Sequence, residues 1–171
     1  MQAFERRKRI LEQLETSQTP VSATALAELC GVSRQIIVGD VALLRAGGAN
    51  VSATPRGYIL TRQPQGVRRT VACVHSAEDM SGELYAIVDN GGEAVDVIVE
   101  HPVYGQITAP LHVRARCDVE AFLEKITSER ARPLSSLTDG VHLHTIACPT
   151  QADMNRVVEA LRSGGFLFEN G

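Results

Sequence analysis

The pattern of apolar and polar positions predicts three helices and a hairpin in the first third of the chain. Residues 4–16 carry apolar side chains near helical spacing, with basic residues between them. Pro20 ends this helix, because proline disfavours helical geometry in the residue before it. Ser22 stands before a second short apolar stretch, where a serine caps a helix well. We therefore expect two short helices before residue 31.

A turn and a third helix follow at the spacing of a helix-turn-helix. Gly31 suits a turn that needs a positive φ, and Ser33 is placed to cap the helix that follows. That helix is predicted to run from Arg34 to about Ala46. Its inward positions are Ile37, Val41 and Leu44. In a helix-turn-helix the second helix of the pair enters the major groove of DNA.

The hairpin comes directly after this helix. Two short strands are predicted at residues 49–54 and 58–60, and the tip Pro55-Arg56-Gly57 lies between them. A hairpin in this place is the wing of a winged helix-turn-helix. We assign residues 1–61 to this domain and residues 62–67 to a linker.

The remaining chain, residues 68–171, alternates between strand and helix patterns. Strands are predicted at 69–75, 94–100, 106–113, 140–147 and 166–169, and helices at 76–89, 118–131 and 150–163. Ser76 and Asp79 have the spacing of a capping box at the first of these helices. The order βαββαβ, with an added αβ unit, predicts a ferredoxin-like sandwich with helices on one face. The fold class is therefore α+β.

Charge divides the chain in the same place. Residues 1–66 carry a formal charge of +3 and residues 67–171 a charge of −6. Since DNA is a dense line of phosphates, only the basic half is suited to bind it. The charge pattern favours a regulator in which one half reads DNA and the other senses a signal.

Composition places the chain in the cytoplasm. No apolar run approaches the ~20 residues that cross a bilayer, and the basic N-terminus has no apolar segment behind it. The four cysteines lie far apart and form no C-x-x-C pair. We expect reduced thiols and no membrane partner.

The start of the third helix holds the candidates for DNA recognition. Arg34 suits guanine and Gln35 suits adenine in the major groove. Ser33 caps the helix, and Arg56 at the tip of the wing is placed to meet a phosphate or the minor groove. Gly39 costs ~1 kcal/mol relative to alanine inside a helix. It either permits a close approach to DNA or is a tolerated weakness, and the sequence does not decide between them.

Histidines carry the chemistry of the second half. His142 and His144 form an H-x-H pair on one strand, so both imidazoles point to the same face. His75 ends an earlier strand, and Glu83 follows it on the next helix. If His142 and His144 lie near the end of the strand that carries His75, three nitrogens and one carboxylate can converge. This ligand set suits one divalent metal such as Zn, Ni, Fe or Mn. The alternative is a hydrogen-bonded structural pair, because H-x-H alone is a weak pattern.

Other residues near this pattern are less informative. His101 precedes a proline and is either a pocket residue or a turn residue. His112 lies in mid-strand near Pro110 and is expected to be structural or exposed. Cys73 and Cys148 have the strand parity of His75 and His144, so they could approach the same site. We interpret both mainly as small buried apolar residues.

Four segments resemble a known family. They are Val32-Ser33-Arg34-Gln35, Ala53-Thr54-Pro55-Arg56-Gly57-Tyr58, Val95-Asp96-Val97-Ile98-Val99-Glu100-His101-Pro102-Val103-Tyr104-Gly105 and Gly140-Val141-His142-Leu143-His144-Thr145. These segments are similar to the niacin-responsive transcriptional repressors of bacterial NAD metabolism, and the similarity covers nearly the whole chain. Members of that family join a winged helix-turn-helix to a three-histidine domain.

The resemblance implies a repressor of genes for NAD synthesis or niacin uptake, with nicotinic acid as co-repressor. It also implies a homodimer on double-stranded operator DNA and one divalent metal held by His75, Glu83, His142 and His144. Nicotinate is then expected to reach the metal or a nearby donor, with its ring near His101 or Tyr104. Gly39 departs from the family's recognition helix, so the operator of this chain is expected to differ.

Two rival functions remain open at this stage, although we predict that the chain is not an enzyme. One is a metal-dependent enzyme that acts on a pyridine compound and carries a fused DNA-binding domain. The other is an architectural DNA-binding protein whose second half only dimerises. Ligand-dependent stability separates the regulator from the second rival, because a ligand of the native state raises stability.

Overall fold

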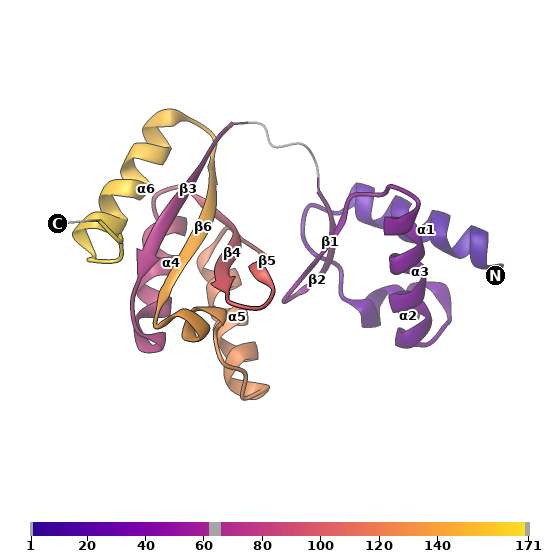
Figure 1. Ribbon diagram of the computed structural model, residues 1–171. Helices are drawn as coiled ribbons and strands as arrows, with labels where there is room; N and C mark the ends of the chain where they lie inside the picture. Colours follow the sequence, from indigo (N-terminus) through magenta and orange to yellow (C-terminus); the bar gives the residue numbers. More distant parts are fainter. Residues whose placement is uncertain (1, 62–65, 170–171) are drawn as a thin grey trace. The chain divides into compact units, whose positions relative to one another are not determined.

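The computed structural model describes residues 2–61 and 66–169. The chain forms two compact units, residues 1–63 and 64–171, which are described separately (Figure 1). The predicted linker, 62–67, lies mostly outside the described residues. Its last residue, Val67, is the first residue of a strand.

The first unit is a three-helix bundle with a hairpin. Its helices are α1 (Ala3–Thr16), α2 (Ala23–Cys30) and α3 (Arg34–Ala46), and its strands are β1 (Val51–Thr54) and β2 (Gly57–Leu60). The helices share one apolar core, whose fully buried members are Ile10, Leu14, Leu26, Ile37 and Val41. These residues recur at helical spacing, which explains why the apolar pattern predicted the helices.

The predicted caps and turn of the helix-turn-helix are confirmed. The Ser22 hydroxyl accepts from the Ala25 N–H at 3.0 Å, and the Ser33 hydroxyl accepts from the Ile36 N–H at 3.4 Å. Gly31 ends α2 with a φ of +66°, a conformation that glycine adopts without strain. Local chemistry alone therefore sets the start and orientation of α3.

The wing is a tight antiparallel hairpin. Thr54 pairs with Gly57, so Pro55 and Arg56 form the turn between the strands. A Cβ atom at Gly57 would collide with the carbonyl of Val21, and its φ is +137°. Gly57 is therefore required where β2 passes the segment between α1 and α2.

The second unit has a four-stranded sheet with helices between its strands. The strands are β3 (Val67–Val74), β4 (Glu93–His101), β5 (Gly105–Val113) and β6 (Val141–Cys148). The helices are α4 (Met80–Val88), α5 (Arg116–Ser128) and α6 (Gln151–Ser163), with short 3-10 segments η1 (Ala77–Asp79) and η2 (Leu134–Thr138). The α+β class and the predicted βαββαβ order are confirmed.

The strand order in this sheet is β3-β6-β4-β5, and every neighbouring pair is antiparallel. Each crossover therefore skips one strand: β6 lies between β3 and β4, and β4 lies between β5 and β6. Helix α4 contacts both α5 and α6. Apolar residues of the helices and strands form the core, among them Leu84, Ile87, Val119, Ile146 and Leu161.

Two local predictions are wrong. The Ser76 side chain makes no capping bond to the helix but donates to Asp79, and the 3-10 turn η1 comes before α4. The expected last strand, 166–169, is a single bridge between Cys73 and Leu167. Both segments are too short for periodicity to distinguish a regular element from an isolated turn or bridge.

Candidate metal centre and DNA-binding helix

The four side chains predicted to bind a metal lie together in the second unit. Each histidine turns its Nε2 atom to the carboxylate of Glu83. The distances are 2.6 Å from His75, 3.1 Å from His142 and 3.3 Å from His144 to the nearer carboxylate oxygen. Three imidazole nitrogens, two from β6 and one from the residue after β3, thus surround one carboxylate.

Strand alternation and helix position bring these residues together. His142 and His144 lie two residues apart on β6, so both point to the face covered by helices. Glu83 lies in the first turn of α4, where the positive end of the helix dipole favours a carboxylate. His75 follows the last residue of β3, the strand paired with β6. The cluster is closed to solvent, and the Glu83 side chain is 1% exposed.

The outer nitrogen of each imidazole is held by a backbone carbonyl. Nδ1 of His75 donates to Ser76, Nδ1 of His142 donates to Gly140, and Nδ1 of His144 donates to Asp96, at 2.6, 2.9 and 2.5 Å. Because a carbonyl oxygen only accepts, we infer that each Nδ1 carries a proton. Each ring is then oriented with Nε2 available inside, as in protein sites where histidine binds a metal.

The ionised carboxylate of Glu83 is the negative centre of the cluster. Burial alone would raise the pKa of Glu83, but the hydrogen bonds from the three imidazoles outweigh burial and hold this pKa well below its usual range. Burial lowers the pKa of His75 and His144, yet their hydrogen bonds, chiefly to Glu83, outweigh it and raise both pKa values. The buried carboxylate therefore attracts positive charge to its own surroundings, toward which each Nε2 atom is directed.

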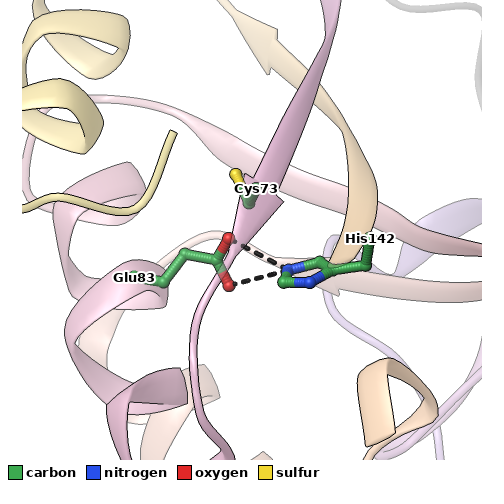
Figure 2. A group of neighbouring side chains, drawn as sticks. All are labelled: Cys73, Glu83 and His142. Atoms are coloured by element: carbon green, nitrogen blue, oxygen red, sulfur yellow. Dashed lines mark hydrogen bonds and ion pairs between the residues drawn. The ribbon is translucent and has the colours of Figure 1, made fainter. Parts of the chain in front are cut away.

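Cys73 is a neighbour of this centre, an approach that its strand parity allowed. Its sulfur lies within 4.8 Å of ligand atoms of Glu83 and His142 (Figure 2). Burial, followed by the charge of Glu83, raises the pKa of the Cys73 thiol. Cys73 is also part of the apolar core, as expected. Cys148 has the same parity but belongs to the core alone, and all four cysteines are free thiols.

The donor set fits a divalent transition metal. Atoms held about 2.0–2.2 Å from one cation lie roughly 3.0–3.4 Å from each other. The Nε2–Glu83 separations of His142 and His144, 3.1 and 3.3 Å, fall within that spacing, whereas the 2.6 Å separation of His75 is a hydrogen-bond distance. Imidazole nitrogens and a carboxylate are accepted by Zn, Ni, Fe and Mn, so the donor set does not select among them.

In the first unit, the predicted base-reading residues lie on the outer surface of α3. Arg34 and Gln35 are both exposed in its first turn, whereas Ile37 and Val41 face the core. Ser33 caps the helix just before them. Arg56 lies half-buried in the turn of the wing. The sequence pattern thus predicted which face of α3 is turned outward.

An ion pair behind α3 was not predicted from the sequence. Asp40 is buried on the inner side of the helix, where Arg6 and Arg7 of α1 contact its carboxylate at 2.5 and 3.5 Å. The outer face of α3 therefore presents no carboxylate. Two of the basic residues counted toward DNA binding are instead committed to a contact inside this unit.

Comparison with known proteins assigns both units. Residues 6–59 match a helix-turn-helix domain family, and residues 68–170 match the 3H domain family. Over 98% of its length the chain is 47% identical to a protein of Thermotoga maritima named "Probable transcription repressor NiaR", covering 95% of that protein. The chain belongs to the family of transcription repressors with a 3H domain. The "Transcription repressor NadR" of Bacillus subtilis is 41% identical over 96% of the chain and 94% of its own length.

Membership in this repressor family settles the broad class of function. The relatives are named as repressors that carry a DNA-binding domain, so the prediction of a regulator and not an enzyme is confirmed. The rival reading of a metal-dependent enzyme is set aside. Among the residues that the structure describes, the repressor has no helix of the length and apolarity that crossing a bilayer requires.

The residues predicted to contact nicotinate lie together, His101 at the end of β4 and Tyr104 in the turn that follows. Nδ1 of His101 accepts from the N–H groups of Val103 and Tyr104, and the rings of His101 and Tyr104 are 5.0 Å apart. His101 ends β4, three residues beyond Ile98, and Ile98 pairs with Leu143 between His142 and His144 on β6. The role of His101 and Tyr104 in ligand binding stays a prediction.

His112 occupies a separate position in the 3H domain. Its Nδ1 lies 2.7 Å from a carboxylate oxygen of Glu93, and Arg114 contacts the other oxygen at 3.0 Å. Burial raises the pKa of Glu93, but these two partners outweigh burial and lower it. The arrangement suits the structural role expected for His112.

Proposed function

We propose that this repressor controls genes of NAD biosynthesis or niacin transport and uses nicotinic acid as its co-repressor. One divalent transition metal per chain, held by His75, Glu83, His142 and His144, forms the sensing centre. The observation that supports the metal most is the common orientation of the three imidazoles, with each Nδ1 held outside and each Nε2 directed at Glu83. The choice of nicotinic acid follows from the resemblance of the chain's motifs to niacin-responsive repressors.

The chain's own residues prepare such a centre for a carboxylate ligand. A bound metal would supply positive charge that attracts the carboxylate. The backbone carbonyls of Ser76, Gly140 and Asp96 hold the imidazoles in place before any ligand arrives. Burial excludes bulk water from the cluster, so charges within it are poorly screened.

On the DNA side, Arg34 and Gln35 would contact base edges, and Arg56 would contact the backbone or the minor groove. We propose a homodimer that presents two α3 helices about one turn of DNA apart, ~34–36 Å. Sedimentation of the repressor with and without a palindromic operator measures the number of copies. A single copy on the complete operator would contradict this arrangement.

The metal is tested by elemental analysis of the purified full chain. We expect about one transition metal ion per chain in the wild type and its loss in His142→Ala. The matched control is His101→Ala, which removes an imidazole outside the cluster. Equal metal content in all three proteins would contradict the assignment. Absence of metal together with unchanged thermal stability on adding Zn²⁺, Ni²⁺, Fe²⁺ or Mn²⁺ would favour a second half that only dimerises.

The co-repressor is tested by titrating a labelled promoter fragment from a gene of NAD biosynthesis or niacin transport. Nicotinate should tighten DNA binding about 5–150-fold, the usual range for allosteric coupling of ~1–3 kcal/mol. Nicotinamide, which has the same ring but no carboxylate, is the matched control and should have a much smaller effect. Equal affinities with and without nicotinate would refute nicotinate as co-repressor while leaving DNA binding itself intact.

A further inference from the structure

The segment that follows α6 lies against the edge of β3 next to the histidine cluster. The Val74 N–H donates to the carbonyl of Phe166 at 2.9 Å, and the Phe168 N–H donates to the carbonyl of Ala72 at 2.9 Å. Between these two bonds, Leu167 forms a bridge with Cys73. The backbone of residues 166–168 is therefore fixed at the level of the cluster.

The ring of Phe166 meets His75 edge to face. The two ring centroids are 5.9 Å apart and the planes are inclined at 88°. This is a favoured geometry for aromatic pairs. His75 follows the last residue of β3, and its backbone N–H donates to the carbonyl of Gly140 at 3.4 Å, whereas His142 and His144 lie inside β6 between two neighbouring strands.

Two glycines make room for this ring. A Cβ atom on Gly82 would lie 3.0 Å from Cζ of Phe166, and one on Gly164 would collide with the ring. Neither glycine has a positive φ, so the backbone does not require them. Gly82 lies in the first turn of α4, one residue before Glu83. At this position the ring of Phe166 occupies the space that a side chain would take.

We propose that Phe166 is a positioning residue of the metal centre: it holds the His75 imidazole against Glu83 and slows the release of the bound metal. This inference rests on the metal site proposed above. His75 is the one ligand of the four that lies outside a regular strand or helix, so it has the most freedom to rotate away. The Phe166 ring blocks that rotation and covers the same side of the cluster from water.

The test measures how fast Zn²⁺ leaves the full-length chain. Each protein is loaded with one equivalent of Zn²⁺ and mixed with an excess of a chromophoric chelator, and the rate of release is recorded. We expect Phe166→Ala to release Zn²⁺ at least tenfold faster than the wild type. Phe166→Leu, which keeps much of the apolar volume, should recover a large part of the slow release.

Two further variants separate positioning from loosening of the whole segment. Phe168→Ala removes an exposed ring two residues away and should release Zn²⁺ at the wild-type rate. Gly82→Ala keeps Phe166 but displaces its ring, so we expect release several times faster even though alanine favours the helix. Thermal unfolding of the metal-free proteins checks that each variant is folded.

The outcomes distinguish this inference from the metal assignment itself. A wild type that retains Zn²⁺ while Phe166→Ala releases it at the same rate would overturn the role of Phe166 alone. Equal acceleration in Phe166→Ala and Phe168→Ala would also overturn it. A wild type that binds no Zn²⁺, or a His142→Ala variant that binds it equally well, would overturn the metal site and this inference with it.

Discussion

The two units of the repressor differ in where their functional polar side chains lie: on the surface in one unit and inside the core in the other. In the helix-turn-helix unit, Arg34 and Gln35 are exposed on α3, while Ile37 and Val41 beneath them are fully buried. In the 3H unit, Glu83 and the imidazoles of the cluster are themselves buried, next to core residues such as Leu84. Removing the functional side chains of the helix-turn-helix unit should leave its core intact, whereas removing those of the 3H unit should disturb its core.

This difference matches the size of the partner proposed for each unit. DNA is far larger than either unit, so its contacts must lie on the surface and remain hydrated until binding. A single cation fits inside a domain, where removal from water strengthens every charge interaction but requires complete pairing. Substitutions in the first unit should therefore change binding more than stability, whereas substitutions in the cluster should change both.

The largest effect is expected for Glu83→Ala. Removing the carboxylate leaves three buried imidazoles facing one another, so we expect a loss of about 3 kcal/mol in the free energy of unfolding. This loss is at the low end of the values expected when one partner of a buried ion pair is removed, because the remaining histidines can become neutral. Chemical unfolding of the metal-free chain measures it, and Glu78→Ala, an exposed residue on η1, is the control. A loss no greater than that of the control would break the contrast between the units.

A smaller effect, on binding alone, is expected for Arg34→Ala. Loss of a bidentate contact to a base should cost ~1–3 kcal/mol of discrimination at one operator position, while the free energy of unfolding changes by less than about 0.5 kcal/mol. Binding to a set of operators with single base changes measures this. Arg56→Ala is the comparison and should weaken binding to all sequences alike. The same loss of base preference in both variants would show that the two roles are wrongly assigned.

The smallest effect is expected for Gly39→Ala. A Cβ atom at this exposed position of α3 would meet nothing within 4 Å, so the alanine variant should unfold with a free energy higher by up to ~1 kcal/mol. Thermal unfolding measures the gain. Operator affinity of the same variant then decides why glycine is present: unchanged affinity indicates a tolerated weakness, and weaker binding indicates a close approach to DNA. A loss of stability would contradict the expected gain.

Most of the first unit could be predicted because its determinants are local. Ser22, Gly31 and Ser33 act on backbone groups within a few residues of themselves, so their types and spacing are sufficient. The partners of Asp40 were not predictable in this way. Arg6 lies 34 residues from Asp40, and no periodic pattern connects α1 to the inner side of α3.

In the 3H unit, strand parity predicted that His142 and His144 share a face, but it could not select their neighbours. His142 lies 59 residues from Glu83, and the two meet only because β6 pairs with β3 next to α4. The same pairing places Cys73 opposite His142, and the bridge to Leu167 brings Phe166 to His75. A short stretch such as 166–169 has too few residues to reveal this contact by its pattern.

The amino-acid sequence by itself determined the helices, caps, turns and alternating faces of this repressor, because these depend on interactions between residues close in the chain. The tertiary structure decided which faces meet. A buried carboxylate is stable only where several donors converge on it, and here those donors come from β6 and from the end of β3. Their convergence is a property of strand order and helix packing, which no single segment specifies.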